Sequence, residues 1–367
     1  MKQNNGLQLL RFIAAGLVLL VHLPTYAVFP FFAGEQRLFS GAIGVDVFFC
    51  ISGLVMYLSV GRKTGPAFAL QFAIRRLFRV VPLYFLLTVL LYVVLSVRAG
   101  NFSDLSACLG KSLAFAYCGT GNGYGDPIIP MGWSLNYEMF FYACLLLGLL
   151  TLKENVLRHV ALLLVAIAVF GWLTNDHFYY VNSIVIEFVF GILLGMYGEQ
   201  IRRRIPKPAA ILLVGLVALL FFGAMVGIDG PESDAAAVSR MTIHFGAAGA
   251  WPRWIVWGLP SLFLCAAFYW LGERVPARLA RLGDFSYSVY LSQVLVMAVY
   301  AGAVKFVYKK LNLALEPSIV HTLGIVALTC GAAYALYYLI ELPWMNLGKR
   351  AGTKAVEKAG LAPSRSS

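Results

Sequence analysis

The run that decides the fold covers residues 80–97 and reads VVPLYFLLTVLLYVVLSV. It contains no charged side chain and is long enough, as a helix, to cross a hydrocarbon core of about 30 Å. In a bilayer every backbone polar group must be paired internally, so such runs form helices. The sequence therefore predicts an all-α protein, a polytopic transmembrane helical bundle of about ten spans. The other expected spans are residues 7–23, 41–60, 132–150, 159–173, 182–198, 209–226, 254–271, 285–303 and 318–340.

The composition also indicates a membrane protein. Hydrophobic residues make up 60% of the chain and charged residues 13%, against about 45–50% and about 25% in soluble domains. The net charge is +12, but the basic residues lie in short loops between apolar runs, which favours a lipid bilayer and not nucleic acid as the partner. Most of these Lys and Arg residues fall on the side of the N-terminus, so the positive-inside rule predicts that both termini are cytoplasmic.

The chain divides into a membrane domain, residues 1–348, and a basic cytoplasmic tail, residues 349–367, whose composition predicts disorder. Residues 1–23 resemble a signal peptide, but Arg11 interrupts the apolar run and no small-residue cleavage site follows, so we interpret them as an uncleaved span. The cysteines lack metal-ligand spacing, and no metal site is predicted. Cys108 and Cys118 share the loop 98–131, where a short helix is expected near 104–117 and a disulfide is the less favoured alternative.

Arg11 and His22 are the clearest polar residues within an apolar run. Eleven residues correspond to about three helical turns, so both lie on one helix face, about 16 Å apart along the axis. Ionisable residues at such positions tend to mark function. Arg11 is either a snorkelling arginine or a binding residue. His22 is either a structural histidine bonded to a neighbouring helix or a general base, since imidazole accepts protons near neutral pH.

A general base of this kind needs a partner that holds its tautomer. Asp46, in the stretch Gly44 to Phe49, and Glu138, in the stretch Trp133 to Glu138, fall at about the depth of His22. Either carboxylate fits that role, and the sequence does not choose between them.

Three arginines, Arg75, Arg76 and Arg79, precede the apolar run of residues 80–97. Guanidinium groups suit phosphate oxygens, and Arg76 and Arg79 are one helical turn apart, so they can clamp one anion. The alternative is that these arginines only set the membrane topology. Later in the chain, Gly191 and Gly195 predict close helix packing, with Glu187 as a buried polar tie.

In their order along the chain, these motifs resemble the acyltransferase-3 family of integral-membrane O-acyltransferases, especially its exopolysaccharide-modifying branch. Two positions depart from the family pattern: Gln293 stands where a histidine is usual, and Leu342 where an arginine is usual. The residues that carry the resemblance are Arg11 and His22; Gly44, Val45, Asp46, Phe48, Phe49, Ser52 and Gly53; Arg76, Arg79 and Pro82; Trp133, Ser134, Leu135, Tyr137 and Glu138; Glu187, Phe188 and Gly191; residues 283–291; and Glu341, Leu342 and Pro343.

The resemblance implies an enzyme of the bacterial inner membrane that moves an acyl group, expected to be acetyl, from cytoplasmic acyl-CoA to a sugar hydroxyl. The acceptor is an exopolysaccharide or a lipid-linked oligosaccharide, and no permanently bound cofactor is expected. His22 would be the general base, with Asp46 or Glu138 beside it. The expected acyl-CoA residues are Arg11, Arg75, Arg76 and Arg79, and the expected substrate-binding residues are Ser52, Trp133 and Ser134.

A transporter or flippase for a lipid-linked sugar or an anion is the competing class. The same polar residues would then line a path and perform no covalent chemistry. The chain shows no inverted repeat of the kind that many transporters carry, and the ordered motif set favours the acyltransferase.

Overall fold

The computed structural model describes residues 4–24, 27, 43–61, 63–119, 125–174, 179–204, 209–217 and 253–360. These residues form helices and no strand beyond an isolated bridge between Ala27 and Ser318. The principal helices are α1 (Asn5–Val21), α2 (Ile43–Val60), α3 (Pro66–Ala99), α4 (Ser106–Leu113), α5 (Gly132–Thr151), α6 (Val156–Thr174), α7 (Ile186–Arg204), α10 (Leu259–Leu271), α12 (Ser286–Lys310), α13 (Ile319–Leu336) and α14 (Leu342–Lys358).

The predicted membrane bundle is confirmed. Within the described residues, eight helical segments are long and apolar enough to cross a membrane, and α1 is a shorter apolar helix. The expected span at 209–226 is helical over 209–217, and its remainder lies outside the described residues. Short one-turn elements join or extend the helices: η2 (Tyr179–Val181), η3 (Ser183–Val185), η5 (Trp254–Gly258), η6 (Gly272–Arg274), α11 (Ala277–Ala280), η7 (Arg281–Phe285) and η8 (Tyr337–Glu341).

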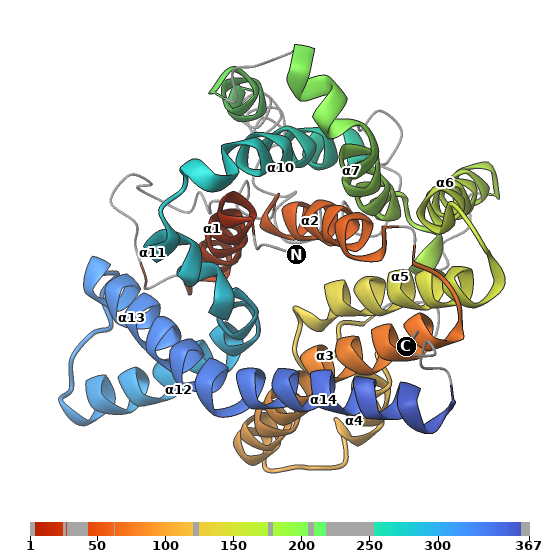
Figure 1. The fold of residues 1–367 in the computed structure, drawn as a ribbon. Coiled ribbons are helices and arrows are strands. Elements are labelled where there is room, and N and C mark those ends of the chain that lie inside the picture. Colours follow the sequence, from red (N-terminus) through yellow and green to blue (C-terminus); the bar gives the residue numbers. More distant parts are fainter. Residues whose placement is uncertain are drawn as a thin grey trace.

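Helices α1 and α2 lie near the centre of the bundle, with α7 and α10 on one side and α3, α5 and α12 on the other (Figure 1). The backbones of α2 and α7 touch. A Cβ added to Gly191 would lie 2.0 Å from the carbonyl oxygen of Cys50, and one added to Gly53 would lie 2.1 Å from that of Phe188. The close packing predicted for Gly191 is therefore confirmed, and it holds the polar residues of α2 and α7 against each other.

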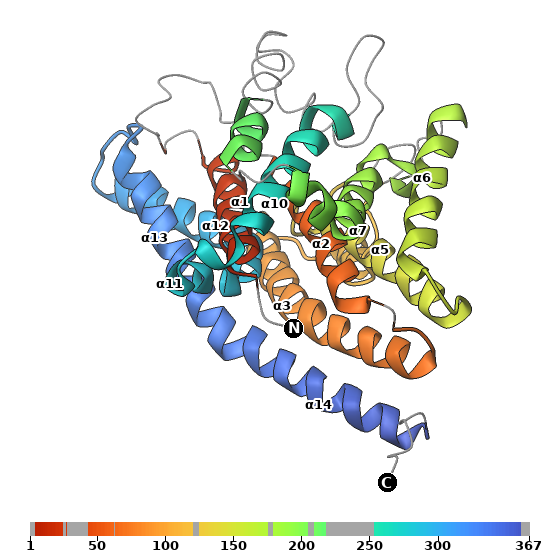
Figure 2. The same ribbon diagram turned by 45° about the horizontal axis from the view of Figure 1, so that its top comes forward.

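The C-terminal segment differs from the sequence-based expectation. Residues 349–358 were expected to be disordered, but they belong to α14, which lies along the N-terminal half of α3 (Figure 2). The Phe78 and Trp344 rings are 5.7 Å apart between centroids. Burial against α3 supplies the packing energy that a basic tail in isolation would lack.

The loop between α3 and α5 also differs from expectation in one respect. Cys108 and Cys118 form a disulfide, which was the less favoured alternative. The short helix expected near 104–117 is present as α4. The disulfide therefore ties the segment that follows α4 back to that helix.

Candidate functional site

Six of the ten candidate site residues line one pocket inside the bundle, which we call the arginine pocket. Its volume is about 70 Å³. Helices α1, α2, α3, α5 and α12 all contribute side chains, so the pocket exists only when these helices pack together. Its polar lining consists of Arg11, Ser52, Arg76, Arg79, Ser134, Glu138, Tyr142, Tyr287 and Tyr290.

Glu138 is the carboxylate of this pocket. Its Oε1 accepts hydrogen bonds from the Ser52 hydroxyl, at 3.2 Å, and from the Tyr142 hydroxyl. Arg76 in turn donates from Nη1 to the Tyr142 oxygen at 3.5 Å, and its guanidinium lies 5.3 Å from the centre of the Tyr142 ring. Glu138 is thus held in place by α2 and α5 and faces the arginines of α1 and α3.

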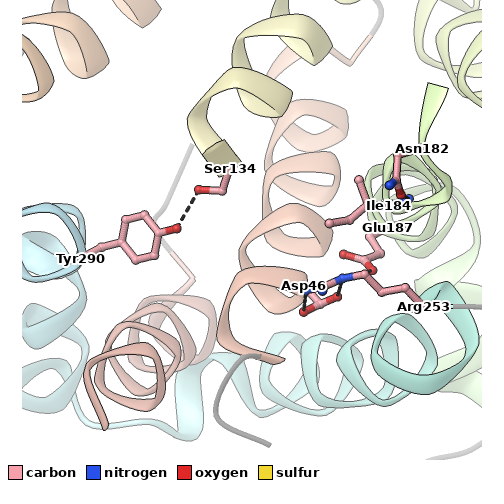
Figure 3. A network of polar contacts seen from close by, with 7 residues as sticks. All are labelled: Asp46, Ser134, Asn182, Ile184, Glu187, Arg253 and Tyr290. Atoms are coloured by element: carbon pink, nitrogen blue, oxygen red, sulfur yellow. Dashed lines mark hydrogen bonds and ion pairs between the residues drawn. The ribbon is translucent and has the colours of Figure 1, made fainter. Parts of the chain in front are cut away.

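Ser134 joins α5 to α12. Its hydroxyl lies 2.7 Å from that of Tyr290 (Figure 3). Both hydroxyls also lie within hydrogen-bond distance of the carbonyl oxygen of Met131. Gln293, the residue that departs from the family pattern, is fully buried on the same helix and donates from Nε2 to the Tyr290 carbonyl at 3.0 Å. Ser134 therefore fixes the relative position of two pocket walls.

Asp46 has a different partner from the one expected. Its two carboxylate oxygens accept hydrogen bonds from Nε and Nη2 of Arg253, at 2.9 and 2.8 Å (Figure 3). Glu187 of α7 lies 4.0 Å from the same guanidinium, and all three side chains are buried. Asp46 thus belongs to a buried ion cluster that ties α2, α7 and the start of η5 together, and the expectation that it orients His22 is not met.

Trp133 lies between this ion cluster and the arginine pocket. The Arg253 guanidinium is 5.9 Å from the centre of its ring, and the Phe49 ring packs edge-on at 6.2 Å. Trp133 is not among the residues lining the arginine pocket. Trp133 therefore packs between Arg253 of the ion cluster and Phe49, which lines the arginine pocket.

His22 ends α1 and opens onto a separate cavity, of about 560 Å³, which we call the His22 cavity. Its Nδ1 lies 2.8 Å from the carbonyl oxygen of Val18. Because a carbonyl oxygen only accepts hydrogen bonds, Nδ1 carries the proton and Nε2 keeps its lone pair. No hydrogen bond joins His22 to Asp46 or Glu138 in the described part of the chain, so a backbone carbonyl does the orienting that we expected of a carboxylate.

Arg11 of α1 and His22, the C-cap residue of the same helix, thus line different cavities. Arg11 lines the arginine pocket, and His22 lines the His22 cavity with Met297, Ala301 and Lys305 of α12. No residue lines both. The two residues, which are about 16 Å apart along the helix axis, therefore belong to two separate sites on one helix.

A third cavity, which we call the basic groove, lies between α3 and α14. Its volume is about 820 Å³. Arg76 and Arg79 line both this groove and the arginine pocket, whereas Arg75 lines the groove alone. The other polar residues of the groove are Ser59, Lys63, Gln71, Lys349, Arg350, Thr353, Lys354 and Glu357.

Two sets of residues at these sites were not predicted from the sequence. The cations of α14 were assigned to a disordered tail, although glycines four residues apart, Gly348 and Gly352, are typical of a helix that packs closely. Arg253 was not singled out, although it directly precedes an apolar run. Both sets contact segments that are distant in the sequence, which local patterns do not reveal.

Comparison with known proteins identifies the family of the chain. The chain is similar to the exopolysaccharide production protein ExoZ of Rhizobium meliloti strain 1021, with 29% identity over 271 residues, 72% of this chain and 78% of that protein. It is also similar to BcsY of Komagataeibacter xylinus, whose description proposes a membrane-bound transacylase, with 28% identity over 310 residues, 77% of this chain and 70% of that protein. No solved structure matches. The family model described as an acyltransferase domain matches residues 4–338, so the chain belongs to the acyltransferase-3 family that its motifs resemble.

Proposed function

We propose that this protein is a membrane O-acyltransferase that moves an acyl group, specifically acetyl, from cytoplasmic acyl-CoA to a sugar hydroxyl of an exopolysaccharide or other cell-surface glycan. The observation that carries the proposal is that α1 and its C-cap residue present an arginine and a histidine to two different cavities. Arg11, in the first half of α1, lines a pocket with two further arginines, and His22, at the C-terminal end, lines a larger cavity and has no hydrogen bond to Nε2 within the described residues. ExoZ, a relative named for exopolysaccharide production, supports the choice of acceptor.

The donor side of the site is basic. The phosphates of acyl-CoA would lie in the basic groove, where Arg76 and Arg79 can donate charge-assisted hydrogen bonds. From there the pantetheine arm would enter the arginine pocket, which shares Arg76 and Arg79 with the groove. Binding energy from the nucleotide, far from the reacting thioester, can offset the cost of orienting the thioester for the reaction.

The acceptor side is the His22 cavity. Nε2 of His22 would take the proton from the sugar hydroxyl as its oxygen attacks the thioester carbonyl. The C–S bond then breaks, the proton passes from His22 to the departing thiolate, and the products are the sugar ester and free coenzyme A. The Val18 carbonyl stabilises the imidazolium that forms between these steps, because it keeps accepting from Nδ1.

The disulfide supports the membrane orientation in this proposal. Disulfides persist in oxidising compartments and are rare in the cytoplasm. The Cys108–Cys118 pair follows α3, so its loop would face the periplasm and the opposite end of α3, with Arg75, Arg76 and Arg79, would face the cytoplasm. This orientation puts the basic groove where acyl-CoA is made and keeps both termini cytoplasmic.

The test compares the ester content of surface polysaccharide, by NMR, in cells with and without the protein, alongside coenzyme A release from acetyl-CoA by the purified protein. We expect loss of the ester in the deletion strain and acceptor-dependent release of coenzyme A. A deletion strain with unchanged ester content would overturn the proposal. Loss of the whole glycan from the surface, with unchanged ester per sugar, would instead identify a flippase.

A further inference from the structure

We propose that α14 forms the second wall of the donor site, and that Lys349, Arg350 and Lys354 bind the nucleotide phosphates of acyl-CoA opposite the arginines of α3. The inference rests on the proposed function, because the acyl-CoA donor is part of that proposal. It goes further by assigning a binding role to a C-terminal helix whose sequence predicts only a disordered tail.

The lengths of the helices put this wall outside the apolar part of the bundle. Helix α3 has 34 residues, and the continuous segment Ile319–Lys358 that ends with α14 has 40 residues. At 1.5 Å per residue these helices are about 51 Å and about 60 Å long, well beyond a hydrocarbon core of about 30 Å. Their surplus ends lie side by side (Figure 2) and carry six of the seven cations of the basic groove.

Close packing fixes α14 in this position. A Cβ added to Gly348 would lie 2.5 Å from the Cβ of Phe78, and one added to Gly352 would lie 3.3 Å from the Cγ of Gln71. The Trp344 ring packs on the Phe78 ring just before these glycines. The α14 cations are thus held on a rigid helix that rests on α3, which lowers the entropic cost of binding a ligand between the two.

The charge of the groove calls for a polyanion. Seven cationic side chains line it, against the single carboxylate of Glu357. Among the described residues no ion pair joins any of these cations to a carboxylate. A single phosphate would leave most of this charge uncompensated, whereas a nucleotide with a diphosphate and a further phosphate would balance it. The cations are Lys63, Arg75, Arg76, Arg79, Lys349, Arg350 and Lys354.

The size and the position of the groove also fit a nucleotide. Its volume of about 820 Å³ lies within the range of about 300–1,000 Å³ that is usual for small-molecule sites. Arg76 and Arg79 face both the groove and the arginine pocket. Phosphates held between α3 and α14 would therefore leave the pantetheine arm at the mouth of the arginine pocket, directed toward the interior of the bundle.

The experiment uses the full chain in nanodiscs of zwitterionic phosphatidylcholine. The groove variant carries Lys349→Gln, Arg350→Gln and Lys354→Gln, and the matched control carries Arg203→Gln, Arg204→Gln and Lys358→Gln. Both lose three exposed cations, and the control residues do not line the groove. Glutamine is a good helix former, so α14 should stay folded. Calorimetry measures Kd for coenzyme A and for its 3′-dephospho form, and acetyl-pantetheine, which has no nucleotide, serves as an alternative donor.

We expect the groove variant to raise Kd for coenzyme A by about tenfold or more, the worth of one lost charge-assisted contact, and the control to change it less than about twofold. The preference for coenzyme A over its dephospho form should shrink in the groove variant, and transfer from acetyl-pantetheine should be unchanged. Equal Kd values for wild type and groove variant would overturn this inference and leave the proposed function standing. No binding of coenzyme A by the wild type would overturn both.

Anionic lipid headgroups are the other source of phosphate at a membrane surface. Native mass spectrometry after reconstitution with phosphatidylglycerol distinguishes the two. Phosphatidylglycerol retained by the wild type and lost from the groove variant, together with equal affinities for coenzyme A, would assign the groove to lipid and overturn the inference.

Discussion

Nδ1 of His22 donates a hydrogen bond to the carbonyl oxygen of Val18, one turn earlier on α1, at 2.8 Å. The last turn of a helix leaves carbonyl oxygens without intrahelical partners, and His22 caps α1 at that end. The ring is therefore oriented by its own helix. A histidine held in this way has the tautomer that a general base needs, without any neighbouring carboxylate.

The first prediction concerns His22 itself. His22→Ala and His22→Gln should both abolish acylation of the surface polysaccharide, because neither side chain can accept a proton at neutral pH. Protein levels in the membrane should stay near wild type, since His22 lies at a helix end and opens onto a cavity. Ester content by NMR and immunoblotting of membranes make the comparison. Full acylation by His22→Gln would sink the general-base assignment.

The second prediction concerns the shared arginines. Arg76→Ala and Arg79→Ala should each weaken acyl-CoA binding by about tenfold or more, because each removes a charge-assisted contact to phosphate. Arg98→Ala, at the opposite end of α3, is the control and should bind normally. Isothermal calorimetry on purified protein provides the affinities. Wild-type affinity in well-folded Arg76 and Arg79 variants would leave these residues with a topological role only.

The third prediction separates Asp46 from catalysis. Asp46→Ala leaves the buried Arg253 guanidinium without its main partner, which costs about 3–5 kcal/mol in known cases. We expect low membrane abundance and a lower unfolding temperature, with near-normal turnover per folded molecule. Thermal unfolding in detergent and transfer assays normalised to folded protein test this. A stable, inactive Asp46 variant would restore Asp46 to the catalytic role that the sequence suggested.

The fourth prediction concerns the membrane orientation. After mild reduction of whole cells, a membrane-impermeant maleimide should label Cys108 and Cys118. The single variants Cys108→Ser and Cys118→Ser should each lack the intramolecular disulfide. Alkaline phosphatase fused within residues 98–131 should be active, whereas fusions within 60–80 should be inactive, because positively charged loops stay in the cytoplasm. Active fusions at 60–80 would reverse the orientation and remove the basic groove from the acyl-CoA pool.

Local patterns in the sequence were sufficient for much of the fold. Apolar runs of membrane length located the helices, since the cost of an unpaired backbone in lipid leaves no other solution. Arg76 and Arg79 are one helical turn apart, and both line one pocket with Arg11; their binding of an anion stays a prediction. These features depend on residues within a few turns of each other, so composition and periodicity are enough to predict them.

The partners of Asp46 and of α14 were decided by tertiary structure alone. Asp46 and Arg253 are 207 positions apart, and a carboxylate in a bundle takes whichever cation the packing of distant helices brings beside it. Residues 349–358 are helical against α3 because Gly348 and Gly352 let the two backbones approach. Such contacts lower the free energy only after the helices have docked, and no local pattern of charge or hydrophobicity encodes which helices those are.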